Sequence, residues 1–172
     1  MLETPPDAQQ IVEAFAGEAC ISLFQAYGLA LEEIDPTRPL DDAVVLTGVI
    51  GFTGPGIRGT CILASTEGPL RRSNPTSGSQ RDWIAELVNQ LVGRVKNHLL
   101  RRGAEVYVTT PVVMRGEHLA PLHRFVLKPQ AFTTTEGGRI FLWVEVEATP
   151  DFHLSTVSAS EAPAAEGDAL LF

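Results

Sequence analysis

The sequence predicts an α+β fold in which long helices pack on a mostly antiparallel sheet. Apolar residues recur at helical spacing in two long segments. Stretches with strand character gather as a pair between these two segments and as a group of three after them. Strands that cluster in this way favour α+β architecture, whereas strands that alternate with helices favour a parallel sheet. With 172 residues the chain can bury a core, and we expect one domain over residues 1–150.

The first helix is predicted over about residues 6–30. Thr4 is a candidate cap, prolines suit a first turn, and Asp7 lies near the positive end of the helix dipole. Helical spacing then connects the apolar residues Ile11, Phe15, Ala19, Leu23 and Ala26. The segment 32–42 contains Asp, Pro and Thr, and we interpret it as a loop.

Residues 44–66, VVLTGVIGFTGPGIRGTCILAST, are predicted to form two strands around a turn. Pro55 and Gly56 supply the fixed φ and the positive φ that a type II turn requires. The many glycines also raise the alternative of a phosphate-binding loop. That alternative fails because no Gly-Lys-Ser/Thr follows and no helix opens directly after the stretch.

The segment 67–80 is rich in Pro, Ser and Gly, and we interpret it as a polar linker. A long helix is then predicted over about residues 79–102, where Gly103 ends it as a cap. Its apolar residues fall in one broad arc of the helical wheel, which predicts a face packed on the sheet. The residues of this arc are Ile84, Leu87, Val88, Leu91, Val92, Val95 and Leu99.

Three more strands are predicted after the long helix, over residues 105–116, 122–134 and 139–149, the first interrupted by Pro111. The sequence Glu-Gly-Gly at 136–138 predicts a hairpin between the last two. Strand RIFLWVEV would be an aggregation-prone edge if it were unpaired, and this favours a homodimer. Residues 151–172 are predicted to form a flexible acidic tail.

Charge and composition exclude several classes of function. The net charge is −8, which argues against nucleic-acid binding, although residues 43–103 are locally basic and are compatible with an acidic protein partner. No apolar run approaches the length of a membrane helix, and the N-terminus does not resemble a signal peptide, so we expect a soluble cytoplasmic protein. Cys20 and Cys61 lie in apolar surroundings and are interpreted as buried hydrophobic residues. The four histidines match no metal spacing, and we expect no metal site.

One polar line along the long helix is unusual. Asp82, Glu86, Asn89 and Gly93 gather opposite the apolar arc, within roughly 60° of each other, and Lys96 flanks them. A solvated surface explains their position. It does not explain why Asn and Gly, which each cost about 0.5–1 kcal/mol in a helix interior relative to Ala, occupy neighbouring turns of one line. The physical pattern leaves both a solvated face and a functional face open.

Residues 82–93 also resemble a known motif. They match the pattern Asp/Ser-x-x-x-Glu-x-x-Asn-x-x-x-Gly of the CheC/CheX/FliY family of chemotaxis phosphatases. The flanks agree, because that family has a glycine-containing strand pair before the helix, like VIGFTGPGIRGTCILAS, and a proline-containing strand after it, like VTTPVVMRG. The similarity covers about residues 40–150. A single copy of the motif resembles CheX more than CheC, and the resemblance implies a CheC-like fold.

The resemblance implies a phosphatase for the aspartyl phosphate of a CheY-type response regulator. By position, Glu86 would engage a lysine of the regulator's pocket, and Asn89 would hold a water in line with the phosphorus. Asp82, Gly93 and Lys96 are then expected to contribute to binding, with Gly93 giving clearance. The protein would need no cofactor of its own, because Mg²⁺ belongs to the regulator. Two alternatives remain, which are a non-catalytic adaptor of the same fold and an unrelated α+β binding domain.

Overall fold

The computed structural model describes residues 7–37, 45–117, 119, 121 and 127–155. Within these residues three helices and seven strands follow one another in the predicted α+β pattern. The helices are α1 (Ala8–Ala26), α2 (Glu67–Ser73) and α3 (Gln80–Arg101). The strands are β1 (Glu32–Ile34), β2 (Val45–Gly54), β3 (Ile57–Thr66), β4 (Tyr107–Val108), β5 (Val112–Gly116), β6 (Gln130–Thr133) and β7 (Arg139–Ala148).

All seven strands form one sheet in the order β1-β6-β7-β3-β2-β4, and β5 pairs with β2 beside β4. Every one of these pairings is antiparallel. The β2–β3 hairpin turns at Pro55–Gly56, as predicted, and Gly56 has a φ of 73°. Pro111 separates β4 from β5, since its ring removes a backbone donor from the ladder.

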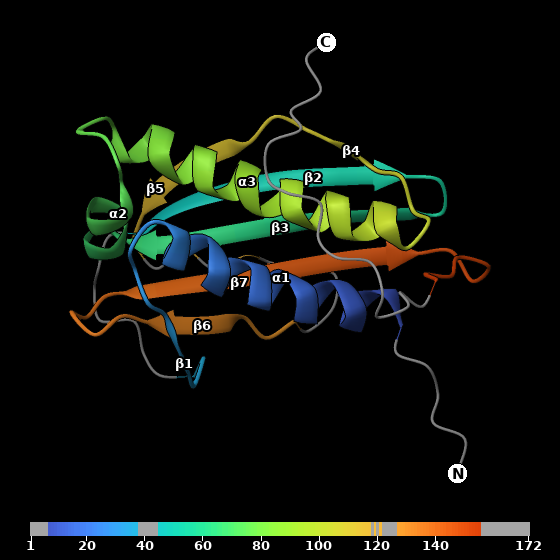
Figure 1. Cartoon of the computed structure of the whole chain (residues 1–172), viewed down its shortest axis with the longest axis horizontal. Coiled ribbons are helices and arrows are strands. Elements are labelled where there is room, and N and C mark those ends of the chain that lie inside the picture. The colour runs from blue at the N-terminus through green and yellow to red at the C-terminus, as the bar shows by residue number, and fades with distance from the viewer. Residues whose placement is uncertain (1–6, 38–44, 118, 120, 122–126, 156–172) are drawn as a thin grey trace.

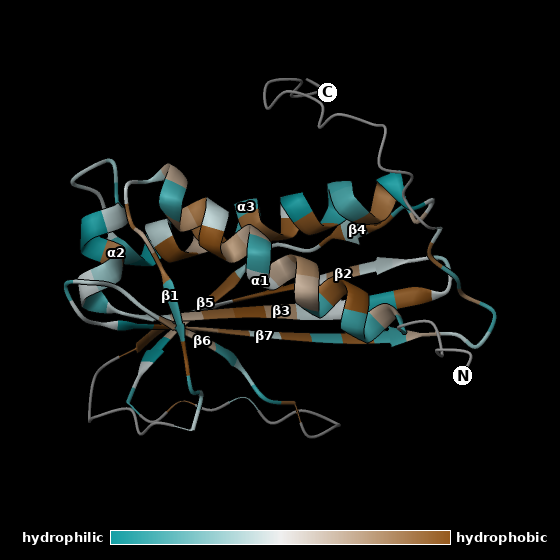
Figure 2. Ribbon diagram, turned by 60° about the horizontal axis from the view of Figure 1, so that its bottom comes forward, coloured by the Kyte–Doolittle hydropathy of each residue, from teal (hydrophilic) through white to brown (hydrophobic). Residues whose placement is uncertain are grey.

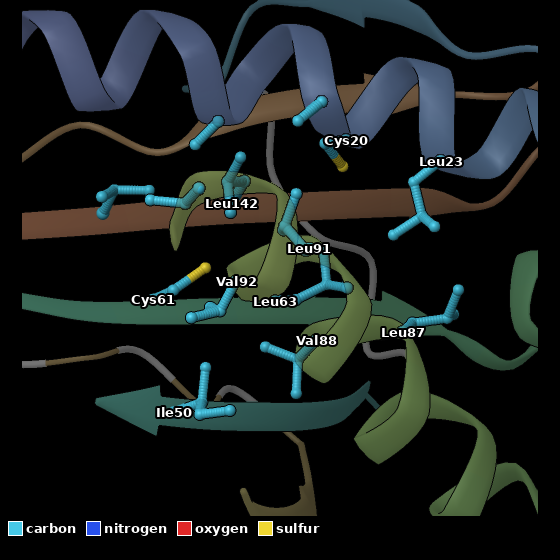
Figure 3. Packing of buried hydrophobic residues seen from close by; sticks show 14 of the residues in the cluster. Cys20, Leu23, Ile50, Cys61, Leu63, Leu87, Val88, Leu91, Val92 and Leu142 are labelled. Carbon is cyan, nitrogen blue, oxygen red and sulfur yellow. The ribbon is translucent and has the colours of Figure 1, made fainter. Parts of the chain in front are cut away.

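Helices α1 and α3 lie side by side on the same face of the sheet (Figure 1). Seen from the side, apolar strand residues form a layer beneath them (Figure 2). The entire apolar arc predicted for α3 is buried. In Figure 3, Leu87, Val88 and Leu91 point from α3 toward the sheet, and Cys20 points there from α1. This packing confirms the layered fold and leaves the opposite side of α3 facing outward.

Glycine in β2 lets α3 approach the sheet closely. A Cβ on Gly48 would lie 2.9 Å from Cγ1 of Val88 and 3.2 Å from the carbonyl oxygen of Ile84. Both distances are shorter than ordinary van der Waals contacts of a Cβ, so the spacing between helix and strand depends on the missing side chain. Gly48 therefore sets the height of the first half of α3 above β2.

The boundaries of α1 differ from the prediction. Asp7 itself is the N-cap, since its Oδ1 accepts a hydrogen bond from the backbone N–H of Gln10 at 2.8 Å. Thr4, the cap expected from the sequence, lies outside the described residues. The helix ends at Ala26 and not near residue 30, because Gly28 adopts a φ of 77° and the following backbone N–H groups fold back onto the last turn.

Two segments predicted to be irregular contain short elements. Residues 32–34 form β1, which pairs with β6, so the loop prediction is wrong there. Residues 67–73 form α2, so the linker prediction is wrong for that stretch. Pro69 is tolerated in the first turn, where its missing N–H is not needed, and Leu70 is fully buried. Burial against the domain stabilises α2 despite its unfavourable composition.

The C-terminal part of the structure differs from the prediction in three places. Strand β6 begins at Gln130, and residues 122–126 of the predicted strand lie outside the described residues. Strand β7 pairs with β3 on one side and β6 on the other, so β7 is not an unpaired edge and gives no reason to expect a homodimer. Phe152 and Leu154 pack against the core, which places them with the domain. Residues 156–172 of the predicted tail lie outside the described residues.

Candidate functional site

The outward side of α3 carries the polar line predicted from the sequence. Asp82, Glu86 and Asn89 are exposed, whereas Gly93 and Lys96 are half-buried. The apolar arc fixes this orientation, since rotating α3 would remove Leu87 and its neighbours from the core. The exposure expected for Glu86 and Asn89 is therefore confirmed, and both side chains face solvent.

The carboxylate of Glu86 is held from within the protein. Nε2 of Gln90 donates a hydrogen bond to Oε1 of Glu86 at 2.7 Å. The hydroxyl of Tyr27, just past the end of α1, donates to Oε1 of Gln90 at 3.0 Å. Neither Gln90 nor Tyr27 was predicted from the sequence as part of the site. The spacing of four between Glu86 and Gln90 could have indicated their contact, but no local pattern connects either one to Tyr27.

Asn89 is in a different situation from Glu86. Within the described part of the chain its side-chain amide makes no hydrogen bond, and it lies exposed one helical turn from Glu86. An amide has two donors and an acceptor oxygen. Asn89 therefore carries a full set of hydrogen-bonding groups that remain available to an incoming molecule.

Gly93 is not required by the packing of this chain. A Cβ built there would meet nothing within 4 Å, and the backbone φ is ordinary for a helix. The surface is hollowed between Gly93 and the end of α1, where a depression of about 460 Å³ is lined in part by Ala26 and Tyr27. The absence of a side chain at Gly93 thus leaves open space outside the protein and relieves no internal clash.

Charged residues of both signs lie along or beside the polar line of α3. Asp82 lies in the first turn of α3, where its backbone N–H faces the capping Oγ of Ser79. A negative charge in the first turn stabilises a helix. Arg94, on the side facing α1, donates from Nη1 to Oγ of Ser22 at 2.6 Å. Lys96 lies on the other flank, beyond Gly93.

Other candidate residues have structural roles. The ring of His98 stacks on Phe15 with the centroids 3.8 Å apart, and its Nε2 accepts a hydrogen bond from Nε of Arg102 at 2.9 Å. Burial, together with the nearby Arg102 and Arg101, lowers the pKa of His98 to about 4. Cys20 and Cys61 are free and buried, and burial raises the pKa of both thiols. Among the residues that the structure describes, no three His, Cys, Asp or Glu side chains are grouped to hold a metal ion.

Solved structures with the same architecture exist. The chemotaxis protein CheX from Vibrio vulnificus superposes with a TM-score of 0.65 at 20% identity, over 81% of this chain and 100% of that one. A CheC-like superfamily protein from Shewanella sp. PV-4 gives a TM-score of 0.66 at 19% identity, over 83% of this chain and 100% of that one. The chain has the CheC-like fold.

A third structure with the CheC-like fold is a complex of CheX with CheY, BeF₃ and Mg²⁺ from Borrelia burgdorferi. It matches with a TM-score of 0.60 at 16% identity, over 78% of this chain and 96% of that one. No family model and no curated protein matches the sequence. In the part of this chain that the structure describes, none of the helices has the length and apolar character needed to span a membrane.

Proposed function

We propose that this protein hydrolyses the aspartyl phosphate of a CheY-type response regulator, with Glu86 and Asn89 of α3 entering the regulator's active site. One observation carries the proposal. On a CheC-like fold, the two side chains lie exposed on the outward side of the same helix, where the sequence motif predicts them. The solved complex of a CheX with CheY supports the choice of a receiver domain as partner. We expect the two proteins to meet in the cytoplasm.

The chemistry accounts for the residue types. An aspartyl phosphate is an acyl phosphate and already has a good leaving group, so an attacking water needs mainly to be placed in line with the phosphorus. The amide of Asn89 can accept from this water and donate to the phosphoryl oxygens. The carboxylate of Glu86 pairs with a lysine of the regulator and fixes the register of the helix. Mg²⁺ is supplied by the regulator.

The surroundings of the two residues suit insertion of the helix. Gly93 leaves open space beside the line, so another protein can approach the backbone of α3 closely. Mid-helix glycine is otherwise unfavourable by about 1 kcal/mol relative to Ala. Asp82 and Lys96, at the two ends of the line, offer charges of opposite sign to the partner. This asymmetry favours one orientation of docking over the reverse.

The test measures phosphate release from a phosphorylated CheY-type receiver domain with Mg²⁺, for the wild type and Asn89→Ala. We expect the variant to lose roughly 100-fold in rate or more, because the group that orients the water is gone. Its stability should change by no more than about 0.5 kcal/mol, because Asn89 is exposed and Ala favours helix.

The matched control is Asn97→Ala, an exposed asparagine about two turns further along α3 and outside the motif. It should keep the wild-type rate. Equal rates for wild type and Asn89→Ala would refute the mechanism. A wild type that releases no phosphate but binds the phosphorylated receiver tightly would establish the adaptor alternative instead.

A further inference from the structure

A chain of hydrogen bonds runs from the end of α1 to the carboxylate of Glu86. The hydroxyl of Tyr27 bonds Oε1 of Gln90 at 3.0 Å, and Nε2 of Gln90 bonds Oε1 of Glu86 at 2.7 Å. Residues 27 and 90 are far apart in sequence, so the α1–α3 packing brings them together. Gln90 is half-buried, whereas Glu86 is exposed.

The donors and acceptors of the three side chains determine the direction of these hydrogen bonds. A carboxylate only accepts hydrogen bonds, so the amide must turn its NH₂ toward Glu86. The amide oxygen of Gln90 then faces Tyr27, whose hydroxyl can donate. The opposite orientation of the amide would put its oxygen against the carboxylate. Each member therefore determines the orientation of the next.

This chain of hydrogen bonds is anchored in the protein core at Tyr27. The ring of Tyr27 meets the indole of Trp83 edge-on, with centroids 4.7 Å apart at 89°. Trp83 is only 7% exposed. Its Nε1 donates to Oγ of Ser73, a buried residue of α2, at 2.9 Å. Thus three elements, α1, α2 and α3, hold the donor that faces Glu86.

We propose that Gln90 and Tyr27 are positioning residues that hold the Glu86 carboxylate in its binding conformation before the regulator arrives. This inference rests on the proposed function. A free glutamate on a helix surface samples several rotamers and loses that freedom on binding. A carboxylate already held by Gln90 loses less, and preorganisation of this kind increases affinity. Within the described part of the chain Oε2 of Glu86 accepts no hydrogen bond, so it is available to the regulator's lysine.

Asn89 and its neighbour Gln90 should affect different kinetic constants. Asn89 acts on the reacting water, so its loss lowers kcat. Gln90 and Tyr27 act only through the orientation of Glu86, so their loss raises KM and leaves kcat nearly unchanged. Because Tyr27 acts through Gln90, removing both should weaken binding no more than removing Gln90 alone.

Three variants test this with the phosphorylated receiver domain: Gln90→Leu, Tyr27→Phe, which keeps the ring against Trp83, and the double variant. We expect KM to rise about fivefold for Gln90→Leu and for the double variant, and less for Tyr27→Phe, with kcat within about twofold of wild type. The control is Gln10→Leu, an exposed glutamine at the far end of α1, which should keep the wild-type KM.

A second readout uses the free protein. The side-chain amide signals of Gln90 in a ¹H–¹⁵N NMR spectrum should shift in both Tyr27→Phe and Glu86→Ala, because each variant removes one hydrogen bond. Unchanged signals would overturn the inference whatever the activity. Shifted signals with wild-type KM in every variant would also overturn it while the phosphatase assignment stood. A wild type that neither hydrolyses nor binds the receiver would instead refute the proposed function.

Discussion

Gly93 and Asn89 illustrate how single residues on α3 depart from what helix stability favours. Both are poor helix formers in the middle of a helix of 22 residues. Neither is explained by contacts inside the described part of the chain, since Asn89 is unbonded there and a Cβ at Gly93 would meet nothing within 4 Å. The proposed function, in which both positions face the regulator, would account for both.

Gly93→Ala should separate stability from binding. The new methyl group enters open space and improves helix propensity, so the free energy of unfolding should rise by up to about 1 kcal/mol. Affinity for the activated receiver should fall, because the methyl group occupies the clearance beside Asn89. Chemical denaturation and calorimetric titration with a BeF₃-activated receiver measure the two effects. A gain in stability with unchanged affinity would remove Gly93 from the binding surface.

His98 should make the stability of the fold depend on pH. Its pKa is lowered from 6.5 to about 4 in the folded protein by burial and by Arg102 and Arg101. The unfolded chain therefore takes up a proton first as the pH falls, and stability contributed by neutral His98 is present above about 6.5 and lost between about 6.5 and about 4. Denaturation across this window should show a dependence that His98→Gln reduces. An identical pH profile for the variant would contradict the assignment.

At the scale of elements, the contact between α3 and β2 determines where the polar line of α3 lies. Helix α3 packs on β2 near Gly48 and is connected to α1 through Gln90 and Arg94. Helix α2 supports the start of α3 through the hydrogen bond from Trp83. The exposed line therefore stands on a helix that other elements hold on both sides.

Gly48→Ala tests this packing. The added Cβ would lie 2.9 Å from Val88, so α3 or β2 must shift, and we expect a loss of about 1–3 kcal/mol in the free energy of unfolding. The matched control is Gly51→Ala on the same strand, where the nearest atom would be 3.5 Å away. That variant should unfold like the wild type in the same denaturation experiment. Equal stability of the two variants would show that Gly48 does not set the spacing.

At the scale of the whole molecule, the helices cover one face of the sheet and leave β5 beside β2 at its border (Figure 2). The register pairs Val112 with Val49 and Met114 with Thr47. These residues alternate with Gly48, which faces α3, so they lie on the opposite face of the sheet. Val112 is 60% exposed and Met114 is 44% exposed, which makes this border an apolar surface.

We propose that two copies of the chain form a homodimer through the β5 border. Val112→Lys should shift the protein toward the monomer, because a charge there opposes burial of the border. Light scattering over a range of concentrations measures the change, with Thr110→Lys as a control at an exposed position just before β5. A wild type that stays monomeric over the whole range would rule out the dimer and leave the phosphatase proposal intact.

Local patterns in the sequence determined α3, the β2–β3 hairpin and the exposed line of Asp82, Glu86 and Asn89. Each depends on periodicity or turn chemistry within one continuous segment, and such signals do not need the rest of the fold. The outward position of Glu86 and Asn89 followed directly from the burial of the apolar arc opposite them.

Only the tertiary structure decided the features that join distant segments. Strand β1 has three residues, too few for a periodic signal, and forms because β6 offers it backbone partners. Helix α2 forms because the domain buries Leu70. Tyr27 meets Gln90 because α1 and α3 pack side by side, and neither residue type indicates that contact. Side-chain and backbone pairing across such separations depends on the positions of whole elements, which local sequence does not contain.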